Sequence, residues 1–312
     1  MTGEPKRPPI AHWDDVPAAH RSAGHVDGLW QALGRAAGSA TVGLNRVRVA
    51  PGCWSTPVHV HGRSEEMFVV LAGDGFSWQD GDVFEVGPGD LIVHLAGGAP
   101  HSLCAGADGI DVLVFGPRPT NDPGYLPRAG VVRMGAASFR VDDVHPDERE
   151  RRAGEPDLAP PSRRPPSIVR IPEVPAREHR GATVSRSRRD LGRAAGSLTT
   201  GMTYYDVAPG MLATPPHCHS AEEELFVVLG GDGVLSLGDE EHPVRRGHVV
   251  ARPAGTRVAH GFRAGAEGLT MLAYGTRDPN DACFYPRSGK VYFRGLGVIG
   301  RLEQLDYWEG ED

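Results

Sequence analysis

The chain has 312 residues with 42 Gly, 27 Pro, a hydrophobic share of 39% and a formal net charge of −7. This apolar share excludes a disordered chain, and no apolar run reaches the ~18 residues of a membrane-spanning helix. The acidic balance excludes a general nucleic-acid binder. Because the four cysteines are too few for a disulfide scaffold and the first residues lack a signal-peptide core, we expect a cytoplasmic protein without nucleic-acid or membrane partners.

Short strands separated by tight turns are the main local pattern. The first strand-like segment ends at Pro51-Gly52, and the next one ends at Gly73-Asp74-Gly75. The apolar segments of the first half are 41–50, 66–72, 83–86, 91–95 and 110–116. Strands of this length and spacing predict an all-β sandwich or small barrel, with helix confined to short segments.

The chain contains the same unit twice. The heptapeptide LGRAAGS at 33–39 recurs at 191–197, and NDPGYLPRAG at 121–130 matches NDACFYPRSG at 280–289. Charges, Pro and Gly replace apolar periodicity between the copies, which is typical of a linker. We therefore predict an N-terminal domain over 1–146, an extended and exposed linker over 147–166, and a C-terminal domain over 167–312.

Each copy carries histidines and glutamates in one pattern. His59 and His61 are two residues apart on a predicted strand, so both side chains leave the same face. Glu65 and Glu66 open the next strand, and a third histidine, His101, follows a turn-rich segment. The second copy repeats the set as His217, His219, Glu223, Glu224 and His260. Three imidazoles and one carboxylate can converge inside a small barrel, where they suit Fe, Mn, Co, Ni, Cu or Zn and leave coordination positions open.

These segments resemble the two motifs of the cupin superfamily, and the duplication resembles a bicupin. The first motif has the form G-x5-HxH-x3,4-E-x6-G, and here Glu66 and Glu224 are each followed by six residues and a glycine. The second resembles Gly89–His101 and Gly247–His260. One departure is that six residues, rather than five, separate Gly52 from His59.

The resemblance implies two tandem double-stranded β-helix (jelly-roll) barrels, each with one divalent transition metal. Fe(II) is preferred, with Mn, Ni, Co, Cu or Zn open. The implied ligands are His59, His61, Glu66 and His101 in the first domain and His217, His219, Glu224 and His260 in the second. Glu66 and Glu224 are the implied catalytic carboxylates, acting as ligand or base. Glu65 and Glu223 are expected to point outward or to support the ligands.

Residues that differ between the copies are candidates for substrate selection. On the strand before the first histidine, Arg46 and Arg48 could bind an oxyanion, and Tyr204 lies on the matching strand of the second copy. Periodicity leaves open which register faces the interior, so a surface role for the arginines is equally compatible. His94 and His248 do not match each other, and we expect both at the surface. No cysteine is matched between the copies, which argues against a duplicated thiol function.

Three functions remain compatible with this pattern. The resemblance to quercetinase-like bicupins favours a metal-dependent dioxygenase, an oxidoreductase acting on a small enolic, phenolic or carboxylate substrate. The same site could serve a non-redox isomerase or a decarboxylase that uses the metal as a Lewis acid. A non-catalytic small-molecule binder is the third function, and the retention of eight ligands counts against it. We expect a small-molecule substrate, and either a monomer with an internal pseudo-dimer or a homodimer.

Overall fold

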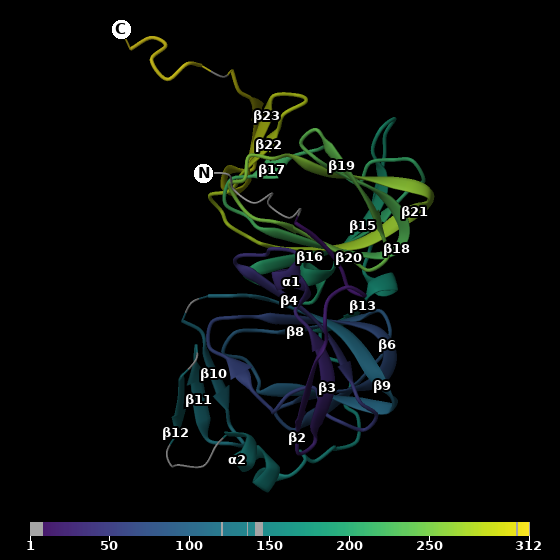
Figure 1. Ribbon diagram of the computed structural model, residues 1–312, viewed down its shortest axis with the longest axis vertical. Helices are drawn as coiled ribbons and strands as arrows, with labels where there is room; N and C mark the ends of the chain where they lie inside the picture. Colours follow the sequence, from purple (N-terminus) through teal and green to yellow (C-terminus); the bar gives the residue numbers. More distant parts are fainter. Residues whose placement is uncertain (1–8, 120, 136, 141–145, 304, 312) are drawn as a thin grey trace.

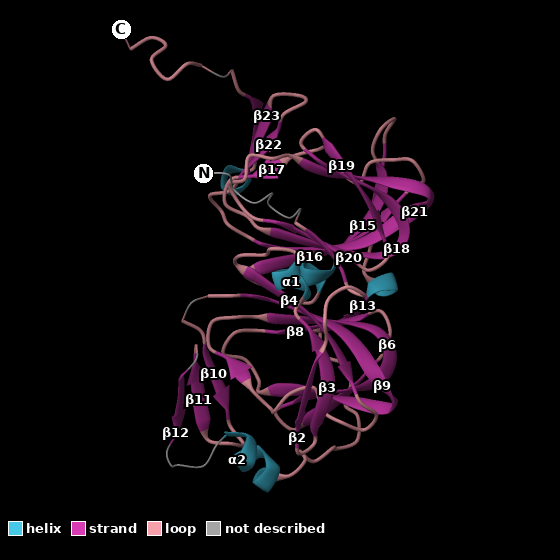
Figure 2. Ribbon diagram, viewed as in Figure 1, coloured by secondary structure: helices cyan, strands magenta, loops and turns pink. Residues whose placement is uncertain are grey.

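A computed structural model describes residues 9–119, 121–135, 137–140, 146–303 and 305–311. Figure 1 shows two β-barrels, with the N-terminal half (purple to blue) below and the C-terminal half (green to yellow) above. Strands dominate both halves (Figure 2). The predicted all-β class with two tandem jelly-roll barrels is therefore confirmed.

Each barrel pairs an eight-stranded sheet with a four-stranded sheet among the described residues. The eight-stranded sheet of the lower barrel consists of β2 (Ala19–Ala23), β3 (Val26–Gln31), β4 (Val42–Val49), β6 (Glu66–Gln79), β7 (Asp82–Val86), β8 (Asp90–His94), β9 (His101–Pro117) and β13 (Ile168–Arg170). Its four-stranded sheet consists of β5 (Val60–His61), β10 (Pro123–Leu126), β11 (Val131–Met134) and β12 (Ala137–Arg140). The eight-stranded sheet of the upper barrel consists of β1 (Ile10–His12), β14 (Arg177–Arg180), β15 (Ser185–Asp190), β16 (Thr200–Val207), β18 (Glu224–Leu237), β19 (Glu240–Arg245), β20 (His248–Arg252) and β21 (His260–Thr276). Its four-stranded sheet consists of β17 (Cys218–His219), β22 (Ala282–Tyr285), β23 (Lys290–Phe293) and β24 (Val298–Arg301).

The two repeats exchange their first strands. β1 pairs with β20 of the upper barrel, with Ile10 opposite Val250, and β13 pairs with β8 of the lower barrel, with Ile168 opposite Ile92. The predicted domain ranges place each of these strands with its own repeat, whereas each strand completes the sheet of the other repeat. Internal repetition reveals that two copies exist, but it does not show which sheet edge an equivalent strand joins.

An apolar core joins the two barrels. Leu44, Met67 and Leu91 from the lower barrel form one buried cluster with Leu225 and Tyr274 from the upper barrel, and each of these side chains is at most 1% exposed. Side chains alternate along a strand, so one face of β4 fills its own barrel while the other meets the neighbouring domain. Because the shared cluster would be exposed in an isolated domain, we expect neither barrel to fold alone.

The helices are short. α1 (Leu33–Ala36) and α3 (Leu191–Ala194) are the equivalent helices of the two repeats, and Figure 1 shows α1 between the barrels. The remaining helices are α2 (Pro146–Ala153), η1 (Ile171–Glu173) and η2 (Arg294–Leu296). None of the helices in the described ranges is long and apolar enough to span a bilayer.

Part of the predicted linker is helical and anchored. Glu150 of α2 is only 1% exposed, and its carboxylate lies 3.1 Å from His25 Nε2 and 3.5 Å from an Arg128 guanidinium nitrogen. Acidic residues in the first turn and arginines in the last turn suit the helix dipole. The expectation of an extended, exposed segment is therefore wrong for α2, because one buried acid within a highly charged stretch gives no apolar periodicity.

Candidate metal centres

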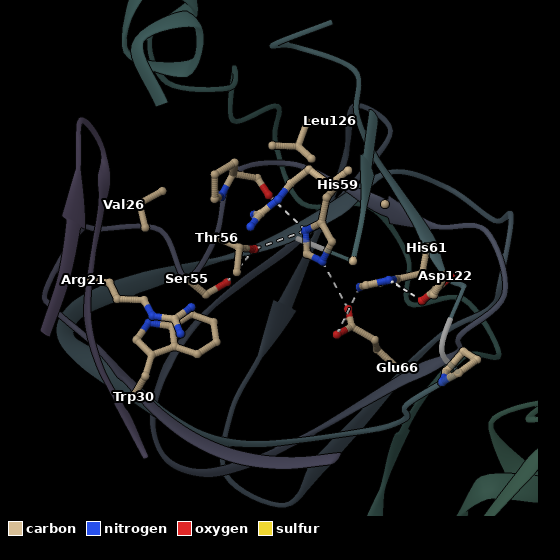
Figure 3. Close-up of a pocket in the computed structure, with 15 residues that line it drawn as sticks. Arg21, Val26, Trp30, Ser55, Thr56, His59, His61, Glu66, Asp122 and Leu126 are labelled. Carbon is tan, nitrogen blue, oxygen red and sulfur yellow. Dashed lines mark hydrogen bonds and ion pairs between the residues drawn. The ribbon is translucent and has the colours of Figure 1, made fainter. Parts of the chain in front are cut away.

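The N-terminal centre gathers three imidazoles around one carboxylate. His61 belongs to β5, Glu66 is the first residue of β6 and His101 is the first residue of β9. The Glu66 carboxylate oxygens lie 3.3 Å from His59 Nε2, 3.6 Å from His61 Nε2 and 3.1 Å from His101 Nε2. Figure 3 shows His59 and His61 turned toward Glu66 across the cavity. The four predicted ligands of this domain therefore converge at one point.

The opposite nitrogen of each ring is held by an acceptor. His59 Nδ1 donates to the Pro57 carbonyl at 3.0 Å, His61 Nδ1 to Asp122 at 2.8 Å and His101 Nδ1 to the Ala99 carbonyl at 3.1 Å. A proton fixed on Nδ1 leaves the Nε2 lone pair available, as in histidines that ligate metals. The ring orientations are thus preset for a cation in front of the Nε2 atoms.

The C-terminal centre repeats this arrangement. The Glu224 carboxylate lies 3.9 Å from His217 Nε2, 3.4 Å from His219 Nε2 and 3.0 Å from His260 Nε2. Despite this proximity, His219 Nε2, His260 Nε2 and Glu224 Oε2 are buried without a hydrogen bond of acceptable geometry. Buried polar atoms are rarely left without partners. Orphaned nitrogens and a carboxylate oxygen facing one point fit a divalent cation with mixed N and O ligands.

Asp122 and Asp281 orient one ligand in each domain, and both are absent from the sequence-based prediction. Asp281 accepts a hydrogen bond from His219 Nδ1 at 2.7 Å, as Asp122 does from His61. Both follow an asparagine in the repeated segments at 121–130 and 280–289. The repeat itself was the signal that could have identified them, because an acidic residue matched near a matched ligand set suggests a shared role.

The electrostatics of both centres follow from the close approach of acids and imidazoles. Burial raises the pKa of the Glu66 carboxyl, but hydrogen bonds from His101, His59 and His61 outweigh it and hold the pKa well below its usual value. Burial lowers the pKa of His61, but Glu66 and Asp122 outweigh it and raise the pKa to about 9. Burial lowers the pKa of His219 in the same way, but Asp281 and Glu224 raise it to about 10. Without metal, each centre therefore holds a proton at neutral pH.

Metal binding is expected to release that proton. A metal bound at Nε2 of His61 or His219 competes directly with the proton, so affinity should rise with pH and level off above the pKa. Between about pH 6.5 and 8.5 we expect the logarithm of the binding constant to rise by about one per pH unit at the N-terminal centre, and by at least as much at the C-terminal centre. Calorimetric titration of Mn²⁺ into metal-free protein, in two buffers of different ionisation enthalpy, would count the protons. An affinity independent of pH would contradict this expectation.

The glutamates that precede the ligands point into the other domain. The Glu65 carboxylate accepts hydrogen bonds from Ser197 Oγ at 2.7 Å and the Thr200 amide at 2.8 Å. Reciprocally, Glu223 accepts from Ser39 Oγ at 2.8 Å and the Thr41 amide at 2.6 Å. Both residues are 2% exposed. The prediction that these residues turn away from the metal agrees with this geometry, and their place at the domain interface is the new observation.

A cavity of about 450 Å³ lies beside the N-terminal ligands. Its walls include the apolar side chains of Val26, Trp30, Pro57 and Leu126. Arg21 and Arg133 also line it, and the Arg21 guanidinium stacks on the Trp30 ring at 4.7 Å. The cavity therefore suits a substrate with an apolar or aromatic body.

The corresponding cavity in the C-terminal domain, of about 350 Å³, has the opposite character. Arg186 and Arg188 of β15 line it, and each has a buried Nε without a hydrogen-bond partner. The repeat aligns them with Gly28 and Trp30 of β3, so two arginines replace a glycine and an indole. Three further arginines line this cavity: Arg193, Arg277 and Arg294.

The predicted substrate residues Arg46, Arg48 and Tyr204 do not face either cavity. Arg46 pairs with Asp111 at 2.6 Å and stacks on the Trp13 ring at 4.3 Å. Arg48 is exposed, and Tyr204 packs against the core between the domains. These even-numbered residues share the outward face of their strands, and a one-residue change of register moves a side chain to the other face. The residues of β16 that do line the C-terminal cavity are Gly201, Thr203 and Tyr205.

His94 is buried, whereas we expected it at the surface from the sequence. It is 5% exposed, and its ring stacks on the ligand His101 with centroids 3.6 Å apart and an angle of 3°. Burial and the neighbouring His101 lower the pKa of His94 well below its usual value, so this imidazole is neutral. The expectation of a surface residue is wrong because β8 lies between β6 and β13, inside the sheet. His248 is half-buried and packs edge-on against His12.

Comparisons with known proteins agree on the architecture. The family model described as Cupin domain matches residues 45–114 and 203–273. No curated protein sequence matches the chain. Oxalate decarboxylase from Bacillus subtilis at pH 4.6 superimposes with a TM-score of 0.59 at 17% identity, over 88% of this chain and 78% of that chain. A structure of the same B. subtilis enzyme, reported with an assignment of its Mn(II) centres, gives 0.58 at 16% identity over the same shares. At such identity the likeness is one of fold.

Proposed function

Because this chain is a bicupin, with a cupin domain in each repeat, we propose that it is a metal-dependent enzyme whose C-terminal domain acts on a small organic acid. The observation that carries the proposal is the pair Arg186 and Arg188, which line a cavity that also contains the ligands His217, His219 and Glu224. A guanidinium that points into a metal-ligand cavity is suited to hold a carboxylate beside the metal.

The ligands of each metal are proposed to be the three histidines and one glutamate predicted from the sequence. Their N and O donors suit Fe(II) and Mn(II), and the second is the metal named for the B. subtilis structure. A bound divalent ion would supply Lewis-acid polarisation of a substrate oxygen. The residues of the cavity then have to hold the carboxylate of the acid, so that the rest of the substrate lies at a fixed distance from the metal ligands.

The contacts of the two arginines show how that orientation would be achieved. Arg186 donates to the Ala213 carbonyl and lies over the Tyr205 ring at 5.1 Å, so its guanidinium is held in place before a substrate enters. Its Nε and the Nε of Arg188 remain unpartnered. A carboxylate in the cavity would compensate the charge of both guanidinium groups, which favours an organic acid over a neutral aromatic substrate in this domain. We place decarboxylase-type chemistry first for this cavity.

Replacing either arginine tests the proposal. With Mn²⁺-loaded protein and a panel of small mono- and dicarboxylates, we expect Arg186→Met and Arg188→Met to raise KM by about 10- to 100-fold, because each removes charged hydrogen bonds worth about 1.5–3 kcal/mol. Metal content should not change. Arg48→Met, an arginine on an exposed strand face, is the matched control and should behave as the wild type. Turnover of carboxylates that is insensitive to both cavity variants would refute the proposed role.

A second function is supported by the other cavity. The apolar walls around Trp30 and Leu126 suit an enolic or phenolic substrate, for which a dioxygenase reaction is the candidate. Oxygen uptake with such substrates, compared with carbon dioxide release from the carboxylates, separates the two reactions. Oxygen consumption that survives His217→Ala but not His59→Ala would assign the oxidative activity to the N-terminal domain.

We also propose that the protein acts as a monomer with an internal pseudo-dimer, binding a small-molecule substrate. The apolar core shared by the two repeats supports this proposal, since it already covers the face that a single cupin barrel would otherwise leave open. Light scattering coupled to size-exclusion chromatography checks it, and a mass of twice the chain would contradict it.

A further inference from the structure

The C-terminal centre contains a sulfur atom that has no counterpart in the N-terminal centre. Cys283 of β22 is the direct cross-strand partner of the ligand His219. In the first repeat the partner of His61 is Gly124. Residues directly opposite each other in an antiparallel pair have Cβ atoms about 5 Å apart on the same face. The strand register therefore places the thiol on the face of the sheet from which His219 reaches the centre.

The surroundings of the thiol are those of a ligand cluster. Cys283 is 3% exposed and lines the C-terminal cavity. Its Sγ and one ring nitrogen each of His217 and His219 all lie within 4.8 Å of one another. Independently, His219 Nε2 and His260 Nε2 are buried without a hydrogen-bond partner. Burial raises the pKa of this thiol to about 12, so without metal it is neutral.

We propose that Cys283 is an additional, sulfur ligand of the C-terminal metal, so that the two centres of this chain prefer different metals. On binding, the S–H bond breaks, the proton passes to solvent and the sulfur forms a bond to the metal, with no change of oxidation state. A thiolate favours borderline metals such as Co²⁺ and Zn²⁺ over Mn²⁺. The N-terminal centre keeps only nitrogen and oxygen donors. This inference rests on the proposed metal centres, but not on which reaction the protein performs.

The test uses full-length, metal-free protein titrated with Co²⁺ under anaerobic conditions. We expect two Co²⁺ per chain but a thiolate-to-metal charge-transfer band corresponding to only one. The band should persist in His59→Ala, which disrupts the other centre, and disappear in His217→Ala. Cys283→Ser should lose the band and retain two Co²⁺. Cys218→Ser is the matched control, because Cys218 lies next to the same ligand but pairs with Phe284, and it should keep the band.

A gain-of-ligand variant makes the test independent of whether Cys283→Ser folds well. A Cβ added at Gly124 would meet no atom within 4 Å, so Gly124→Cys is sterically tolerated. It should create a second thiolate band and shift the N-terminal centre from Mn²⁺ toward Co²⁺ by at least about tenfold in relative affinity. Two bound Co²⁺ without any thiolate band in the wild type, or a band that survives Cys283→Ser, would overturn the inference. Failure to bind Co²⁺ at all would instead overturn the proposed centres themselves, and this inference with them.

Discussion

Replacing Glu223 by alanine is expected to lower the free energy of unfolding by about 3–5 kcal/mol, because removing one partner of a buried charged network leaves the others unsatisfied. Its carboxylate accepts hydrogen bonds from Ser39 Oγ and from the backbone amides of Ala40 and Thr41, at 2.6–2.9 Å, and from the Thr41 hydroxyl. All these donors belong to the other domain. The loss should appear as a lower midpoint in urea-induced unfolding followed by circular dichroism.

Glu65, the counterpart of Glu223 in the first repeat, allows the same experiment on the other domain. Glu65→Ala removes the equivalent carboxylate, which accepts hydrogen bonds from Ser197, Leu198 and Thr200. It should lower the free energy of unfolding by a similar amount. Glu241→Ala, at an exposed position, should change stability by no more than about 0.5 kcal/mol. A loss below about 1 kcal/mol in both interface variants would show that the paired carboxylates do not hold the domains together.

Removing one histidine from either centre is expected to abolish metal binding in that domain alone. His59→Ala and His217→Ala should each reduce the metal content from two equivalents per chain to one. The activity assigned to the affected domain should fall on the order of 1000-fold, since the charge stabilisation supplied by a bound metal is worth several kcal/mol. Metal analysis by mass spectrometry, together with assays of both activities, checks the stoichiometry and the assignment at once.

An exposed histidine provides the control for this pair. The side chain of His20 is 61% exposed, so His20→Ala should retain two metals and both activities. Retention of two metals in His59→Ala or His217→Ala would show that the proposed ligand set is wrong for that domain. If each variant loses its metal but only one loses activity, the other centre has a structural role.

The paired glutamates show why some site residues could be predicted from the sequence and others could not. The resemblance to the first cupin motif implied Glu66 and Glu224 as the residues that turn into the barrels, and alternation along the strand then directs Glu65 and Glu223 outward. What those outward carboxylates meet depends on the packing of a second domain more than 130 residues away in the chain. No local pattern carries that information.

The residues of the cavity walls, like the paired glutamates, could be predicted from the sequence only in part. Arg46 and Arg48 looked suitable for an oxyanion, yet their strand register directs them away from the cavity. Arg186 and Arg188 line the C-terminal cavity, and they lie on β15, the neighbour of β16 in the other barrel. Periodicity identifies two faces of a strand, and only the assembled sheet shows which of them is inside.

The sequence by itself determined the duplication, the all-β class and the residues that converge on each candidate metal centre. These properties depend on local spacing and on alternation along strands, which are present in the linear order of residues and appear twice. Only the tertiary structure decided that the repeats exchange their first strands and that Glu65 and Glu223 bind the opposite domain. It also decided that one cavity has apolar walls around Trp30 and Leu126, whereas the other is lined by five arginines. The physical reason is that these contacts depend on pairing and packing between strands that are far apart in the sequence. The two repeats offer equivalent strand edges and faces, so the linear order of residues does not show which of them meet.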